Sequence, residues 1–181
     1  MRSWAEINLD NLRHNINILK TIAGDSMLLP AIKADAYGHG IAEVFNVLIS
    51  EGIKWVGVAT FNEAEKLRKL DKATNILVFG PVETEDMRKA IDMNIAFPLT
   101  SMDEIDFLNE NNLAPRVHLA VDTGMGRIGF SRNSLDEVKR KTEENSKINV
   151  EGIFSHLSSA DTSPEYTKRQ LEDFKKIVEK F

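Results

Sequence analysis

Short apolar runs alternate with amphipathic stretches along the chain. The runs that predict strands end at residues 33, 59, 79, 99, 122 and 156. Between them, apolar residues recur at helical spacing, as in the stripe Leu12, Ile16, Leu19 and Ile22. Strands that alternate with helices are typical of βαβ units, so the pattern predicts an α/β fold with a parallel sheet.

Polar residues at the ends of these runs predict where helices begin and end. An initial strand is expected over 4–10, with Asp10 capping the helix that follows, and Gly52 would end a helix over 41–51. The last helix is expected over 165–181. The other predicted helix starts are Asn62 and two capping boxes, Ser101 with Glu104 and Ser134 with Glu137.

Composition narrows the class of protein. The chain has 181 residues, of which 42% are hydrophobic, so it is long enough to bury a sizeable core as one domain. Its formal net charge of −5 argues against a nucleic-acid or anionic-membrane surface. It has no cysteine, which fits a reducing cytoplasm, and no apolar run of the ~20 residues that a membrane span needs. We therefore expect a soluble cytoplasmic protein.

Reactive side chains follow several of the expected strand ends. Lys33 closes the apolar run 27–33, and Tyr37 lies in the glycine-bounded loop after it. Arg127 lies in the loop DTGMGRIG, and His156 ends the last expected strand. Because parallel sheets bind ligands at the carboxyl ends of their strands, we expect these four residues to converge on one rim.

This set of groups suits one cofactor. A neutral lysine amine is a nucleophile toward an aldehyde, which makes Lys33 a candidate for a Schiff base with pyridoxal phosphate. The Tyr37 hydroxyl can bind a phosphate, and the His156 imidazole can lie against a ring. Arg127 can hydrogen-bond a ring oxygen or a substrate carboxylate. No metal site is predicted, because the four histidines are dispersed.

Each residue taken alone also has an ordinary structural explanation. Lys33 could be a solvated strand flank, Tyr37 a loop anchor, and His156 a satisfied polar residue at a strand end. Two other histidines favour structural roles, with His39 capping the following helix and His118 packed in mid-strand. Arg127 is harder to dismiss, because the glycines beside it leave room for a ligand.

Two motifs carry a resemblance to a known family. The stretches AIKADAYGHG (31–40) and VDTGMGRIGF (121–130) resemble the alanine racemases, which depend on pyridoxal phosphate and belong to fold type III. The opening WAEINLDNLRHNI and the stretch GIFSHLSSAD are similar to the same family, in the same order and spacing. The resemblance spans essentially the whole chain.

The resemblance implies a role for each matching residue. Lys33 would hold the cofactor covalently and act as the base on the D-alanine side, so it is the expected catalytic residue. Met125 and Arg127 are the expected substrate-binding residues. The expected cofactor-binding residues are Lys33, Tyr37, Phe79, Arg127 and His156.

The resemblance also implies the domain organisation. Family members have an eight-stranded barrel followed by a β-rich C-terminal domain and act as homodimers. Residues 1–181 would be the N-terminal part of the (β/α)8 barrel domain, with about six of eight βα units and without the C-terminal domain. The second base and the partner of the pyridine nitrogen would then lie outside this chain, which would be weak or inactive alone. Ala120 stands where many members have a lysine that orients the arginine.

Several functions stay open at this point. The resemblance implies interconversion of L- and D-alanine, which supplies D-alanine for cell-wall peptidoglycan. A serine racemase of the same family is a near alternative, because the residues that select the substrate are expected in the half of the family's length that this chain does not span. A non-catalytic barrel protein of pyridoxal-phosphate homeostasis, or a fragment without retained function, are alternatives from other classes.

Overall fold

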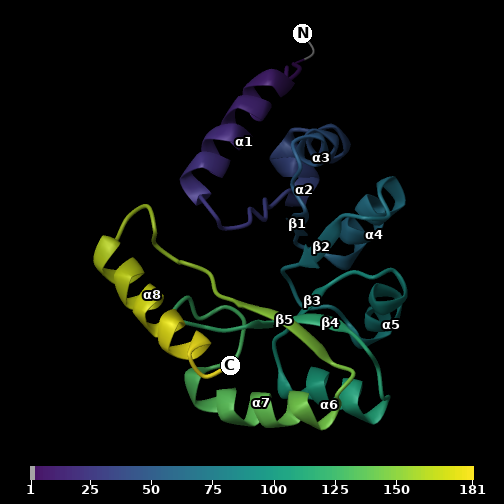
Figure 1. Cartoon of the computed structure of the whole chain (residues 1–181), viewed down its shortest axis with the longest axis vertical. Helices are drawn as coiled ribbons and strands as arrows, with labels where there is room; N and C mark the ends of the chain where they lie inside the picture. Colours follow the sequence, from purple (N-terminus) through teal and green to yellow (C-terminus); the bar gives the residue numbers. More distant parts are fainter. Residues whose placement is uncertain (1–2) are drawn as a thin grey trace. The chain divides into compact units, whose positions relative to one another are not determined.

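The computed structural model describes residues 3–181, which divide after Gly80 into two compact units. The helices and strands of each unit are labelled in Figure 1. None of the helices in the described range is long and apolar enough to cross a membrane.

The first unit combines four helices with two parallel strands. β1 and β2 pair in parallel, with Trp55 opposite Asn75 and Val58 opposite Val78. An isolated parallel bridge between Ala31 and Gly57 adds a third segment beside β1. The elements are α1 (Leu9–Ala23), α2 (Lys33–Gly38), α3 (Ile41–Ser50), β1 (Trp55–Val58), α4 (Phe61–Leu70) and β2 (Asn75–Val78).

The start of the first unit differs from the prediction. Residues 4–10 do not form a strand, because they have no strand partner; α1 begins at Leu9 and is capped by Asn8 instead of Asp10. The Asn8 Oδ1 atom accepts the N–H groups of Asp10 and Asn11 at 3.0 and 2.9 Å. The prediction of a strand over 27–33 was also wrong, because this segment makes a single isolated bridge at Ala31.

The predicted apolar stripe of α1 is buried only in part. Ile16 is 4% exposed, whereas Leu19 and Ile22 are 52% and 75% exposed. The helix packs against α3, whose apolar face includes the fully buried Phe45. The prediction of a helix over 41–51 is confirmed to within a residue.

Helix α4 begins with a capping box that lies two residues before the predicted start at Asn62. Thr60, instead of Asn62, is the N-cap, and its side chain accepts the N–H of Glu63 while the Glu63 carboxylate accepts the N–H of Thr60. The helix packs against β1 and β2, and its residues Ala64 and Leu67 are fully buried. The Thr-x-x-Glu pattern of residues 60–63 is a sequence signal for such a capping box.

The second unit is built on three parallel strands in the order β3-β4-β5. Its strands carry the buried residues Phe97, Leu99, Val117 and Leu119, and helices α6 and α7 pack against each other (Figure 1). The elements are α5 (Thr84–Asp92), β3 (Phe97–Leu99), α6 (Met102–Glu110), β4 (Arg116–Ala120), the 3-10 turn η1 (Arg132–Ser134), α7 (Leu135–Glu144), β5 (Asn149–Phe154) and α8 (Pro164–Val178).

The two predicted capping boxes of this unit have different outcomes. Ser101 and Glu104 form the predicted box at the start of α6. The box at Ser134 and Glu137 was wrong, because the Ser134 hydroxyl donates to the Ser131 carbonyl at 2.8 Å within η1. The parallel βα succession nevertheless confirms the predicted α/β class in both units.

Candidate functional site

Lys33 stands at the start of an unusual turn. The four residues after it, Ala34 to Tyr37, have φ between 52° and 56° and ψ between 37° and 52°, which is the left-handed helical region. Residues other than glycine enter this region at about 1–2 kcal/mol each, because their Cβ crowds the following carbonyl oxygen. The turn therefore depends on the surrounding structure, as strained segments at functional sites do.

Specific hydrogen bonds hold the turn. The Asp35 Oδ1 atom accepts the Ile41 N–H at 2.8 Å and so supplies a cap at the start of α3. The Ala34 N–H donates to Glu63 Oε1 at 2.7 Å. His39 does not cap α3, since its Nδ1 atom lies 2.8 Å from the Ala36 carbonyl oxygen within the turn. Within this frame the Lys33 side chain is half-buried and Tyr37 is 59% exposed.

Phe79 lies at the same carboxyl edge of the first unit. It follows β2 directly, and its N–H donates to the Val58 carbonyl at 2.8 Å. Its ring lies on the backbone of Gly57, where an added Cβ would stand 2.0 and 2.3 Å from ring carbons and 2.9 Å from Leu29. Any side chain at position 57 would therefore displace the ring.

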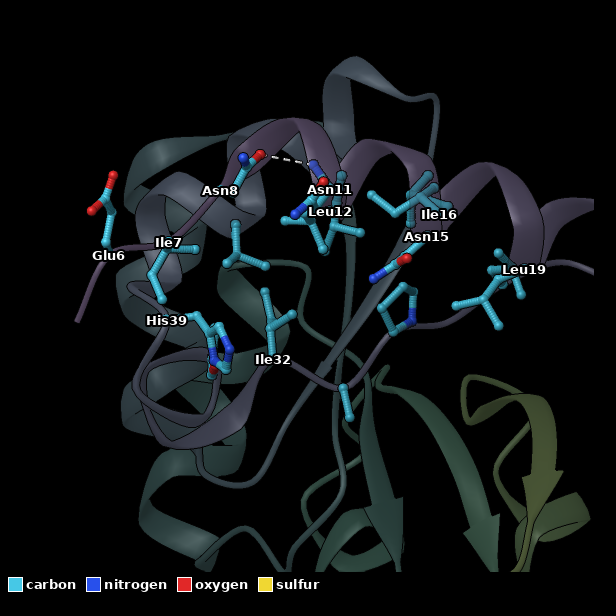
Figure 2. A pocket seen from close by; sticks show the side chains of 17 residues that line it. Glu6, Ile7, Asn8, Asn11, Leu12, Asn15, Ile16, Leu19, Ile32 and His39 are labelled. Carbon is cyan, nitrogen blue, oxygen red and sulfur yellow. Dashed lines mark hydrogen bonds between the residues drawn. The ribbon is translucent and has the colours of Figure 1, made fainter.

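The first unit also has a cavity, and Lys33, Tyr37 and Phe79 do not line it. It measures about 510 Å³ and opens between α1, the segment 28–32 and α3, as Figure 2 shows. Asn11, Ile16 and His39 are among the residues that line it, whereas Lys33 and Tyr37 are not. We therefore do not assign the cavity to the predicted site.

The loop that carries Arg127 in the second unit is organised by Asp122. The Asp122 carboxylate accepts the N–H groups of Gly124 at 2.8 Å and Gly126 at 2.9 Å. Burial raises the pKa of Asp122, but these bonds and the Met125 N–H outweigh it and bring the pKa below its ordinary value. Both glycines have positive φ, 132° and 72°, as this tight loop requires.

Two side chains of this loop, Met125 and Arg127, differ in exposure. Met125 is half-buried and Arg127 is exposed. Ala120 is 1% exposed at the end of β4, so no charged group stands at the place where the resemblance leads us to expect a lysine. Any support of Arg127 from that position is absent in this chain.

His156 follows β5 and is exposed. Its carbonyl oxygen accepts the Gln170 side-chain N–H at 3.0 Å, and the same amide group donates to Thr123 Oγ1 at 3.3 Å. The Gln170 side-chain oxygen, Oε1, accepts the Ser158 N–H at 3.0 Å. Gln170, which is 1% exposed on α8, thus connects the loop before Arg127 with the segment of His156.

We expect Gln170→Leu to destabilise the second unit by about 1–3 kcal/mol, because it removes three partly buried hydrogen bonds, each of which contributes about 0.5–1.5 kcal/mol. Urea unfolding would measure the change, and amide hydrogen exchange would show faster exchange at Ser158. Leu171→Ala, which changes an exposed neighbour on α8, is the control. An equal loss of stability in both variants would contradict the role of the amide.

The lowered pKa of Asp122 predicts a pH dependence of stability. A carboxylate whose pKa is lower in the folded than in the unfolded state adds stability above the unfolded value of ~3.9, and this stability is lost as the pH falls through the folded value. We expect Asp122→Asn to destabilise the protein at pH 7 and to change it much less at the acid end. Urea unfolding of both proteins over this pH range would measure it. A difference that does not depend on pH would refute the assignment.

The structure assigns the predicted site residues to two groups. Lys33, Tyr37 and Phe79 lie at the carboxyl edge of the first unit. Met125, Arg127 and His156 lie in the loops after β4 and β5 of the second unit. The convergence of both groups on one rim stays a prediction.

Comparison with known proteins identifies the family. Residues 7–181 match the family model described as the N-terminal domain of alanine racemase. The chain is 37% identical to the alanine racemase of Fusobacterium nucleatum over 98% of its length, and 39% identical to alanine racemase 1 of Clostridium acetobutylicum over 94%. It spans about half the length of these relatives, 51% and 46%.

Solved structures agree with this match. A structure of alanine racemase from Clostridium difficile in complex with cycloserine superposes with a TM-score of 0.91 at 34% identity. The superposition covers 99% of this chain and 51% of that one. The predicted fold is thereby confirmed as the parallel (β/α) barrel type of alanine racemase, present in part. The chain belongs to the alanine racemase family and matches its N-terminal domain.

Proposed function

We propose that this protein interconverts L- and D-alanine with pyridoxal 5'-phosphate as its cofactor. The observation that carries the proposal is the placement of Lys33 directly before a left-handed turn at the carboxyl edge of parallel strands. The relatives that it matches are named alanine racemases, which supports the choice of reaction.

The side chains present fit this cofactor. Lys33 offers an amine, Tyr37 a hydroxyl that is accessible to a phosphate, and Arg127 a guanidinium that is accessible to an anionic oxygen. The Phe79 ring, which lies on the Gly57 backbone, offers an apolar wall. When bound, pyridoxal phosphate supplies an electron sink that makes the α-proton of an amino acid removable.

Each residue has a stated task in the proposal. The Lys33 amine would hold the cofactor through its aldehyde and would serve as the base for the α-proton on one face of alanine. The Tyr37 hydroxyl would bind the phosphate, and the His156 imidazole would help hold the cofactor ring. Arg127 would hydrogen-bond the phenolic oxygen and help hold the substrate carboxylate. Met125 would lie near the substrate.

Racemisation needs a base on each face of the α-carbon, and we assign only Lys33 within this chain. We propose that the other base belongs to a partner subunit in a homodimer, as the family resemblance implies. The reaction would take place in the cytoplasm and supply D-alanine for peptidoglycan. Alanine is proposed as the substrate because the matched relatives carry its name.

Covalent trapping tests the cofactor assignment. The protein is incubated with pyridoxal phosphate, reduced with borohydride, digested, and mapped by mass spectrometry. We expect one reduced phosphopyridoxyl group, located on Lys33. Modification spread evenly over surface lysines, or none at all, would overturn the proposal for this chain. An alanine racemisation assay on the same preparation then tests the reaction itself.

A further inference from the structure

Glu63 joins two segments at the carboxyl edge of the first unit. Its Oε1 atom accepts the Ala34 N–H at 2.7 Å, and its Oε2 atom accepts the N–H groups of Ala59 and Thr60 at 2.9 and 3.1 Å. One carboxylate thus receives backbone donors from the end of β1 and from the residue next to Lys33. Glu63 lies on α4, which is neither of these segments.

The hydrogen bond from Ala34 to Glu63 lies at the start of the strained left-handed segment. Ala34 is the first residue of the left-handed turn, with φ 52° and ψ 52°. An N–H that donates to a carboxylate forms a stronger bond than one that donates to a neutral oxygen. The bond fixes the peptide that joins Lys33 to Ala34, and therefore the direction in which the Lys33 side chain leaves the backbone.

A second capping box in the chain shows what is particular to Glu63. Glu104 accepts the N–H groups of Thr100 and Ser101 at the end of β3, as Glu63 does at the end of β1. Its other oxygen accepts the Thr100 hydroxyl at 3.0 Å, a group of the same segment. The helix-capping role is therefore shared by both glutamates, whereas the bond to a second segment belongs to Glu63.

We infer that Glu63 is a positioning residue for Lys33: its carboxylate ties the left-handed turn after Lys33 to the end of β1. The inference rests on the proposed function for the role of Lys33. The hydrogen bonds of Glu63 to Ala34, Ala59 and Thr60 are present in the protein without cofactor. Glu63 acts on Lys33 through the Ala34 peptide.

Replacing Glu63 with Gln tests the tie. A glutamine has one acceptor oxygen and an amide group that cannot accept, so it cannot serve both sets of N–H donors. Glu104→Gln makes the same chemical change in the box that lacks the tie, and is the matched control. Amide hydrogen exchange at Ala34 and the rate of borohydride-trapped modification of Lys33 are measured in all three proteins.

We expect Glu63→Gln to speed exchange at Ala34 at least tenfold and to slow modification of Lys33 severalfold. Glu104→Gln should leave both quantities at the wild-type level, even if both variants lose similar thermal stability. Unchanged exchange at Ala34 in Glu63→Gln, or the same effect in both variants, would overturn the inference.

Failure of the proposed function and failure of the positioning role give different results. If wild-type Lys33 forms no adduct, the proposed function fails, while the exchange contrast still decides whether the tie exists. If Lys33 reacts equally in all three proteins, the function stands and the positioning role falls. Should Glu63→Gln not fold, Glu63→Asp keeps the charge but shortens the side chain by one carbon. It is expected to lose protection at Ala34, and full protection would refute the geometry.

Discussion

Replacing Lys33 with alanine will abolish the visible absorbance band that we expect the protein to form with pyridoxal phosphate, along with the borohydride-trapped adduct. The expected loss is complete, because the substitution removes the amine that is proposed to bind the aldehyde; Lys33 is half-buried between the bridge at Ala31 and the left-handed turn. Lysines on the surface can react with an aldehyde, but only weakly and reversibly, since nothing around them binds the phosphate and ring. Absorbance titration with the cofactor measures the effect.

The control for this prediction is Lys54→Ala, which removes an exposed lysine that immediately precedes β1. It should keep the band of the wild-type protein. Circular dichroism must show that both variants are folded. A band of equal strength in Lys33→Ala would remove Lys33 from the site, and with it the basis of the proposed function.

Gly57→Val will destabilise the first unit by about 3 kcal/mol, the upper end of the range for overpacked cores. Intrinsic preference predicts the opposite sign, because valine favours strands and glycine weakens them. Steric overlap outweighs this preference and makes the substitution destabilising, since an added Cβ at position 57 would stand 2.0 Å from the Phe79 ring and 2.9 Å from Leu29. Gly57 is buried, and its carbonyl accepts the Ile32 N–H at 2.8 Å, so the strand cannot move aside without losing that bond.

A double variant identifies the cause. Phe79→Leu removes the outer ring carbons that the new side chain would meet, so Gly57→Val with Phe79→Leu should lose less stability than the two single variants added together. Urea unfolding of the four proteins gives the coupling. Simple additivity, or a stabilising Gly57→Val, would show that the ring does not occupy this space.

The sequence predicted those elements whose signals are local. The helix over 41–51 and the capping box of Ser101 and Glu104 depend on residues within a few positions, and both are confirmed. A strand needs a partner that is distant in the chain, and the apolar runs 4–10 and 27–33 do not reveal whether one exists. The first has none in the described residues, and the second keeps one bridge.

For the candidate site, the sequence located the motif residues but not the backbone conformation or the long-range contacts that hold them. The motifs located Lys33 and Arg127, and the structure places the first at a strand end and the second in a loop that Asp122 organises. The left-handed turn was not predictable, because Ala34 to Tyr37 contain no glycine to indicate positive φ. Nor were the contacts of Gln170, since it lies 47 residues from Thr123 in the chain.

The turn after Lys33 has a consequence for local unfolding. Alanine, aspartate and tyrosine prefer the right-handed helix, so an isolated peptide of this sequence has no reason to keep four left-handed residues in a row. The native path of this backbone exists only while Glu63 of α4 accepts the Ala34 N–H and the Ile41 N–H at the start of α3 donates to the Asp35 carboxylate. A partial opening that releases α4 would thus let the turn relax first, and the lysine would lose its orientation before the first unit loses its helices.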